Sequence, residues 1–367
     1  MKNEKARILT FHFVSNYGAV LQTLALSKVL ERYYTSVEVL NYRPKYMLNE
    51  EKNINTNSVK ATIDSIYSMH SFKSRKKFFE NFRKKYLRET KEYLSNEEID
   101  NLEEYDLYVG SDQVWNLDII GEDNTYFAEF INTKPQNTFA YAASIGTSNL
   151  TNEKKEKISK LISNFDNISL REESAAKLLG ECNTKELPVV LDPTLLLSKD
   201  EWKEIFKINQ NLNKKYIFLY SLTANPETLK YAQFISEELK LPIIEVSGKR
   251  KTLKRFVKHK IFYDASPDLF VELLANSEIV ITDSFHATVF SIIFKKNFWC
   301  FGRNVGTYNM NTRLHTLLGY VEMQDRLIEP NDLKNKMHCT HVDIDLHNLK
   351  MKQNESIAFL SNALEIS

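Results

Sequence analysis

The sequence predicts an α/β protein with two domains, each built on a parallel β-sheet. Short runs rich in β-branched and aromatic residues alternate with longer helix-type segments along most of the chain, an order typical of parallel sheets whose strands are joined by helices. A chain of 367 residues is long enough to bury two such cores. We place the first domain at 1–197, with a helical basic insertion at about 45–100, and the second at 198–367, with C-terminal helices that pack back on the first.

Composition and charge narrow the possible functions. The formal net charge is +1, so no overall positive field favours nucleic acid as a partner. No apolar run approaches the roughly 20 residues of a membrane span, and the N-terminal segment carries a strand instead of a signal peptide's apolar core. The cysteines match neither zinc nor disulfide spacing; they are Cys182, Cys300 and Cys339. We therefore expect a cytoplasmic protein without metal or cofactor, and its oligomeric state is left open.

The first strand and helix are joined by a polar turn. The strand runs from Arg7 to Phe13 and the helix from Ala19 to about Tyr33. A glycine in the first βα turn lets a ligand or another part of the backbone come close, but the repeated glycines of a dinucleotide site are missing. The turn is either a binding element or an ordinary connection, and its candidate binding residues are Asn16, Tyr17, Gly18 and Gln22.

The insertion carries a basic segment with interleaved apolar residues. Nine Lys or Arg lie between Lys73 and Lys91, against two Glu. One interpretation is a helix that contacts anionic lipid, or a lipid-pyrophosphate head group, at the inner membrane face. The other is a helix that packs its apolar stripe on the core and leaves its basic face in solvent. That stripe comprises Phe72, Phe78, Phe79, Phe82, Tyr86 and Leu87.

Two further strands of the first domain end in polar turns. Planar polar side chains beside an aromatic ring are typical of sugar-binding sites, although the first cluster can also be a capped turn with a buried tryptophan. After the strand Asp106–Val109 come Ser111, Asp112, Gln113, Trp115 and Asn116, and Ser144 ends the strand Thr138–Ser144, just before a second turn at Ile145 and Gly146.

Arg171 directly follows the strand Ile168–Leu170. An arginine at a strand end can fork onto a carboxylate or a phosphate. An ion pair with a neighbouring glutamate is the alternative interpretation.

The central unit of the second domain is a strand, a tight turn and an apolar helix. Ile279–Thr282 has the length and composition of a buried strand, and Asp283, Ser284 and His286 lie where it turns into the helix. Open α/β sheets bind ligands at the carboxyl ends of their strands, and helix N-termini attract anions. A histidine in the first turn of such a helix is well placed to contact a phosphate or carboxylate.

Known motifs exclude several chemistries. The sequence contains no phosphate-binding P-loop, no HExxH metalloprotease motif and no G-x-S-x-G nucleophile elbow. The residues themselves therefore indicate a two-domain α/β protein that handles an anionic small molecule.

Six motifs resemble those of the polysaccharide pyruvyltransferase family, and they occur in the family's order over roughly residues 7–330. They are N-Y-G-A-V-L-Q at Asn16–Gln22, V-G-S-D-Q-V-W-N at Val109–Asn116, Y-A-A-S-I-G at Tyr141–Gly146, I-S-L-R-E-E-S at Ile168–Ser174, V-L-D-P-T at Val190–Thr194 and T-D-S-F-H-A at Thr282–Ala287. The resemblance implies a GT-B-like fold, in which two Rossmann-type domains face a cleft.

The resemblance also implies a reaction. Members of the family move the enolpyruvyl unit of phosphoenolpyruvate onto two sugar hydroxyls as a cyclic ketal and release phosphate. Their acceptors are sugars of capsular or other cell-surface polysaccharides, often still on a lipid carrier, and no metal is required. Phosphoenolpyruvate is then the donor substrate, a lipid-linked oligosaccharide the acceptor, and contact with the inner face of the plasma membrane is expected.

The resemblance further suggests roles for individual residues. His286 acts as acid/base or phosphate ligand, Arg171 holds the donor, and Asp112 and Asp283 are further catalytic candidates. Many relatives carry Arg two residues before this histidine, where this chain has Ser284. Arg303 or Arg313 could supply the missing cation from the segment that follows.

Two other functions remain open. A GT-B fold also suits a glycosyltransferase that uses a nucleotide sugar, because fold does not fix function. A non-catalytic binding protein of a polysaccharide assembly complex is the third possibility.

Overall fold

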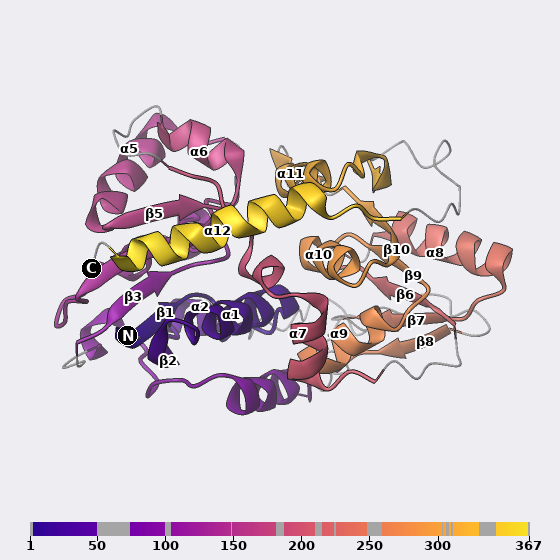
Figure 1. Cartoon of the computed structure of the whole chain (residues 1–367), viewed down its shortest axis with the longest axis horizontal. Coiled ribbons are helices and arrows are strands. Elements are labelled where there is room, and N and C mark those ends of the chain that lie inside the picture. The colour runs from indigo at the N-terminus through magenta and orange to yellow at the C-terminus, as the bar shows by residue number, and fades with distance from the viewer. Residues whose placement is uncertain are drawn as a thin grey trace, which may run out of the picture.

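Figure 1 shows the computed structural model as two α/β domains side by side, with a long C-terminal helix running across them. The structure describes residues 3–49, 74–99, 104–147, 149–180, 187–209, 215–223, 225–247, 259–302, 304–305, 308–309, 311–329 and 343–365. Parallel sheets flanked by helices form both domains, which confirms the predicted fold class.

The first domain contains a five-stranded sheet in the order β2-β1-β3-β4-β5, and every neighbouring pair is parallel. Its β-branched and aromatic strands are buried on both faces, as parallel sheets require. The strands are β1 (Asn3–Leu9), β2 (Tyr34–Val39), β3 (Asp106–Val109), β4 (Asn137–Ala143) and β5 (Asn167–Leu170).

The second domain contains a six-stranded parallel sheet in the order β13-β10-β9-β6-β7-β8. The strands are β6 (Ile217–Tyr220), β7 (Ile243–Val246), β8 (His259–Phe262), β9 (Ile279–Thr282), β10 (Asn297–Phe301) and β13 (Leu327–Ile328). A short antiparallel pair follows β10, made of β11 (Asn304–Val305) and β12 (Tyr308–Asn309).

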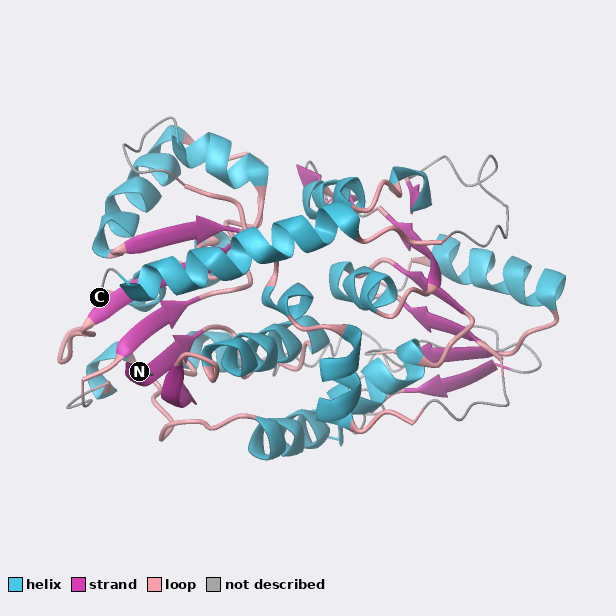
Figure 2. Ribbon diagram, viewed as in Figure 1, coloured by secondary structure: helices cyan, strands magenta, loops and turns pink. Residues whose placement is uncertain are grey.

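Helices cover both sheets (Figure 2). Two of them, α1 and α10, are apolar around most of their circumference and are buried accordingly. The α-helices are α1 (Tyr17–Leu30), α2 (Lys45–Asn49), a helix over 74–86, α4 (Leu117–Ile120), α5 (Asn152–Leu161), α6 (Glu173–Gly180), α7 (Lys199–Phe206), α8 (Pro226–Leu239), α9 (Pro267–Ala275), α10 (Phe285–Ile293), α11 (Thr312–Tyr320) and α12 (His347–Glu365).

The last helix, α12, connects the second domain to the first (Figure 1). The Ser356 hydroxyl accepts a hydrogen bond from the Leu191 amide at 3.0 Å, and the Gln353 side chain donates to the Leu195 carbonyl at 2.9 Å. These contacts fasten α12 to the segment where the chain leaves the first domain.

The basic helix over 74–86 packs its apolar side inward. Phe79 and Phe82 are buried in the main core, and Tyr86 lies against Phe206 of α7. Its lysines at 76, 77, 84 and 85 are exposed. Phe79, Phe82, Tyr86 and Leu87 therefore fit the core-packing interpretation, whereas Phe78 of the predicted stripe is exposed. Phe72 and Lys73 lie outside the described residues.

The strands of each sheet point toward the other domain, so their carboxyl ends meet between the domains (Figure 2). The core cluster around α1 includes residues of both domains and continues across this junction. This arrangement brings together the turns that the sequence singled out.

Candidate active site

A buried cluster of charged side chains lies where the two domains meet. Asp192 follows the bridge between Leu170 and Val189, and its side chain is fully buried. One oxygen, Oδ2, lies 3.1 Å from Arg171 Nη1 and 3.4 Å from His286 Nε2. The other oxygen, Oδ1, accepts hydrogen bonds from the Thr194 amide and hydroxyl. One carboxylate thus links an arginine of the first domain to a histidine of the second.

The charges in this cluster support one another. Burial by itself raises the pKa of the Asp192 carboxyl, but His286 and Arg171 outweigh it and hold that pKa well below its usual range. Burial likewise lowers the pKa of the Arg171 guanidinium, but the carboxylates of Asp192, Asp112 and Glu172 raise it above the ordinary value. Asp192 therefore stays ionised and Arg171 stays charged.

Two nitrogens of the Arg171 guanidinium, Nε and Nη2, are available to a ligand. Its Nη2 lies 3.7 Å from Asp112 Oδ1 and its Nε lies 3.8 Å from Glu172 Oε2, which are ion-pair distances too long for hydrogen bonds. Within the described part of the chain, both nitrogens are buried and have no hydrogen-bond partner. Buried donors normally find acceptors, so these two atoms indicate a place for the oxygens of an anion.

The N-termini of α1 and α10 meet at this cluster. A Cβ atom added to Gly18 would lie 2.0 Å from His286 Nδ1, so only glycine lets the two helices approach this closely. Asn16 caps α1 by accepting from the Gly18 and Ala19 amides, and Ser284 caps α10 by accepting from the Ala287 amide. Both helix dipoles present their positive ends near His286.

A second arginine reaches the same place. The guanidinium of Arg171 lies 5.6 Å from the ring centroid of Phe285. The guanidinium of Arg313, on α11, lies 5.5 Å from the same centroid. Arg313 was one of two candidates to replace the cation missing at Ser284, and the structure places it beside the turn. The other candidate, Arg303, lies outside the described residues.

Hydrogen bonds from other predicted residues hold the cluster in place. Gln22 accepts from the Ser111 amide at 3.0 Å and donates to the Thr10 hydroxyl at 3.0 Å. The Ser111 hydroxyl lies 3.4 Å from both Arg171 Nη1 and Asp192 Oδ2. Ser144 donates to Glu172 at 2.6 Å. Ser111 therefore contacts Arg171 directly, while Gln22 holds Ser111 and Ser144 holds Glu172, which lies beside Arg171.

Some predicted residues serve the packing instead. The Trp115 side chain is fully buried, donates from Nε1 to the Tyr126 carbonyl at 3.0 Å and stacks on Phe127, so its indole offers no face to a sugar. Gln113 accepts from the Asn116 amide. The capped turn with a buried tryptophan is the arrangement that the structure shows.

Tyr17 and Asp283 act as ties within and between the domains. The Tyr17 hydroxyl donates to the Ala265 carbonyl at 2.8 Å, and its ring stacks on Phe270 of α9. The Asp283 carboxylate accepts from the Leu222 and Thr223 amides and from the hydroxyls of Ser221 and Thr223. With both oxygens accepting hydrogen bonds from the loop after β6, Asp283 anchors that loop.

In the sequence, Asp192 and Phe285 stand out only as members of the motifs V-L-D-P-T and T-D-S-F-H-A, and the structure places both at the centre. Asp192 also caps the short helix that follows it, by accepting from the Thr194 amide. Its second contact, with His286 on the other domain, depends on how the domains assemble and leaves no signal in the local sequence.

Neither a metal centre nor a membrane span is found where the chain is described. No group of three or more potential ligand side chains is arranged for a metal ion there. Nor is any described helix both long and apolar enough to cross a bilayer.

The fold and this buried centre define a GT-B protein with a site of paired charges between its two domains. UDP-N-acetylglucosamine 2-epimerase from Rickettsia bellii superposes with a TM-score of 0.51 and 13% identity, over 100% of this chain and 96% of the epimerase. The UDP-GlcNAc 2-epimerase from Methanocaldococcus jannaschii superposes with a TM-score of 0.52 and 14% identity, over 99% of this chain and 100% of the epimerase. At such low identity these similarities establish the fold alone.

The family is established by sequence. The profile of the polysaccharide pyruvyl transferase family matches residues 16–304, which is most of the chain and includes all six motifs in full. The chain therefore belongs to the polysaccharide pyruvyl transferase family. No curated protein gives a significant match to the sequence.

Proposed function

We propose that the protein transfers the enolpyruvyl group of phosphoenolpyruvate to two hydroxyls of a sugar in a cell-surface polysaccharide precursor. The product is a pyruvate ketal, and phosphate is released. The observation that carries this proposal is the pair of buried, unmatched donors on Arg171, beside His286 and two helix N-termini. Family membership supports the same class of reaction.

The donor carries a phosphate and a carboxylate, and the centre offers cationic groups for both. Arg171 Nε and Nη2 can form a fork on one anion, because the guanidinium presents them in one plane. Arg313, whose guanidinium also lies over the Phe285 ring, and the N-terminus of α10 can receive the second anion. Since the Arg171 donors are buried, entry of phosphoenolpyruvate requires the domains to part, a motion common between such domains.

Ketal formation moves two protons. The first sugar hydroxyl adds to the enol carbon while a proton goes to the methylene carbon, which becomes a methyl group. The C–O bond to phosphate then breaks, the second hydroxyl adds to the same carbon, and its proton leaves with phosphate. We assign delivery of the proton to the methylene carbon to His286, which is held by Asp192 at 3.4 Å. We assign removal of a hydroxyl proton to Asp112. The Asp112 side chain is the more exposed carboxylate beside Arg171, at 19%.

The acceptor and its place in the cell follow from this proposal. We propose a lipid-linked oligosaccharide as acceptor, at the inner face of the plasma membrane. The exposed lysines of the helix over 74–86 support contact with anionic lipid.

The direct test is product formation. The protein is incubated with phosphoenolpyruvate and a panel of lipid-linked oligosaccharides, and we expect phosphate release together with a sugar product heavier by one pyruvate ketal. Protection from heat by phosphoenolpyruvate, but not by UDP- or GDP-sugars, separates this function from a nucleotide-sugar glycosyltransferase. Protection by a nucleotide sugar alone would contradict the proposal.

A further inference from the structure

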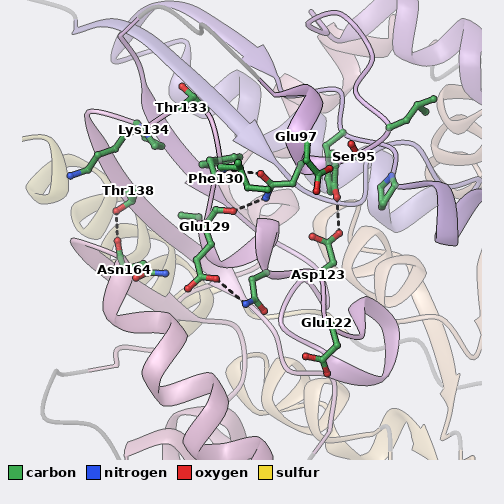
Figure 3. Close-up of a pocket in the computed structure, with 18 of the residues that line it drawn as sticks. Ser95, Glu97, Glu122, Asp123, Glu129, Phe130, Thr133, Lys134, Thr138 and Asn164 are labelled. Carbon is green, nitrogen blue, oxygen red and sulfur yellow. Dashed lines mark hydrogen bonds between the residues drawn. The ribbon is translucent and has the colours of Figure 1, made fainter.

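The first domain contains a large open pocket that shares no residue with the buried centre. Its volume is about 1140 Å³, and it is lined by the segments around residues 42–46, 94–97 and 122–138 and by Asn164 and Asp166 (Figure 3). Such a volume is at the upper end for pockets that bind small molecules. No role predicted from the sequence falls on its lining.

The pocket lies at the end of the sheet opposite to the buried centre. Thr138 is at the beginning of β4 and Asp166 directly precedes β5, whereas Ser144, just after β4, supports Arg171 through Glu172. Six residues of extended strand separate the two ends of β4, or about 20 Å at roughly 3.3 Å per residue. A ligand in this pocket therefore does not contact His286.

The charge of the lining excludes a second site for the donor. Five carboxylates face two lysines, Lys45 and Lys134; the acids are Glu97, Glu122, Asp123, Glu129 and Asp166. An anion such as phosphoenolpyruvate or a nucleotide would be repelled by this excess of negative charge.

The acids are held in place by hydrogen bonds. Asp123 Oδ2 accepts from the hydroxyls of Tyr42 at 2.8 Å and Tyr46 at 3.0 Å. Glu129 accepts from the Asn124 amide nitrogen at 2.8 Å, and Asp166 accepts from the Thr138 amide and hydroxyl. Asp123 is satisfied within the protein, because its Oδ1 also accepts from the Thr125 amide and hydroxyl. Glu129 and Asp166 accept these bonds through one oxygen each, and a fixed carboxylate oxygen is a strong acceptor for hydroxyl groups.

The pocket lining also contains an aromatic ring, Phe130, and the side-chain amide of Asn124. Phe130 lies between Glu97 and Glu129 in the pocket, as Figure 3 shows. Among the described residues, the Asn124 side-chain oxygen is buried and accepts no hydrogen bond, although its nitrogen is engaged. Acceptors beside an apolar ring fit a ligand with many hydroxyls and an apolar face.

We infer that this pocket binds neutral sugar units of the acceptor chain, remote from the sugar that receives the ketal. The chain of a polysaccharide precursor can reach both sites, since they are about 20 Å apart by the strand length. The inference rests on the proposed function for the source of the ligand, but sugar binding itself requires neither phosphoenolpyruvate nor catalysis. Anchoring of the acceptor here would lower its KM without taking part in proton transfer.

Binding is measured by saturation-transfer NMR and titration of the full-length protein with methyl glycosides of galactose, glucose, mannose and N-acetylglucosamine. We expect at least one glycoside to bind. Phe130→Ala should weaken it about tenfold, because the ring contact with the apolar face of the sugar is lost. Glu129→Gln, which keeps the shape and removes the charge of a surface side chain, should weaken it as well and does not endanger folding. Glu238→Gln on α8, exposed and outside the pocket, is the matched control.

His286→Ala and heat protection by phosphoenolpyruvate separate this inference from the proposed function. The glycoside should bind His286→Ala as well as the wild type, and phosphoenolpyruvate should protect Phe130→Ala as well as the wild type. Failure of every glycoside to bind would overturn the inference, as would binding that neither pocket variant weakens. Binding of the cation spermidine in place of glycosides would also overturn it and make the pocket a cation site.

Discussion

Replacing Gly18 with alanine tests how the two domains position His286. The added Cβ would lie 2.0 Å from His286 Nδ1 and 2.4 Å from Cε1. The shortest ordinary contact is 3.4 Å, so the ring or α1 must move by the difference of 2.0 and 3.4 Å, about 1.4 Å. A misplacement of about 1 Å at a reacting group can lower a rate by about a hundredfold.

Stability should change much less than activity. Alanine within a helix is favoured over glycine by up to about 1 kcal/mol, and overpacking costs about 1–3 kcal/mol, so the net loss should be within about 2 kcal/mol. The assay compares phosphate release from phosphoenolpyruvate with the free energy of unfolding from denaturant titration.

Gly180→Ala is the matched control for this substitution. Gly180 ends helix α6, and an added Cβ there meets no atom of the described residues within 4 Å. We expect normal activity for Gly180→Ala and about one hundredth of it for Gly18→Ala. Unchanged turnover in Gly18→Ala would refute the view that the contact between α1 and α10 sets the position of His286.

Three further substitutions test separate parts of the account. Asp192→Asn leaves Arg171 buried beside a neutral partner and should lower the free energy of unfolding by about 3–5 kcal/mol at neutral pH. The pKa of Asp192 is depressed in the folded protein. The stability difference between wild type and Asp192→Asn should therefore be largest above the unfolded pKa of about 3.9 and should shrink as the pH falls below it. A stability difference that does not change with pH would contradict the assignment. Arg313→Ala should raise the KM for phosphoenolpyruvate on the order of tenfold, because a charged hydrogen bond to the donor is lost, and should change kcat less. An unchanged KM in steady-state kinetics would contradict a role for Arg313 in donor binding. Trp115→Phe leaves the Tyr126 carbonyl unpaired and should cost about 1–3 kcal/mol of stability, while KM for the acceptor stays unchanged; a raised acceptor KM with normal stability would restore Trp115 as a sugar platform.

Much of the fold could be predicted because its signals are local. Alternation of β-branched runs with apolar helices marks a parallel α/β architecture, and the turns at Ser111, Arg171 and Ser284 lie at strand ends as expected. The first strand, predicted at Arg7–Phe13, instead runs from Asn3 to Leu9, so Asn16 lies at the start of α1 and not at a strand end. The residue types at those turns correctly indicated where charged and polar groups gather.

The roles of single side chains could not be predicted in the same way. Trp115 and Asp283 both looked suited to a ligand, but their partners, the Tyr126 carbonyl and the loop after β6, are supplied by distant parts of the chain. The sequence marks Asp192 only as part of the V-L-D-P-T motif, and only domain assembly adds its contact with His286. Such contacts depend on the tertiary fold and have no local periodicity.

The central claim is that Arg171 and His286 form the donor site for pyruvyl transfer. The most direct measurement is calorimetric titration of phosphoenolpyruvate into the wild type, Arg171→Lys and His286→Ala, in parallel with phosphate release in the presence of acceptor. We expect the wild type to bind and turn over, Arg171→Lys to bind more weakly because it loses the planar fork, and His286→Ala to lose turnover while remaining folded. Undiminished binding by Arg171→Lys together with near-normal turnover by His286→Ala would contradict the account.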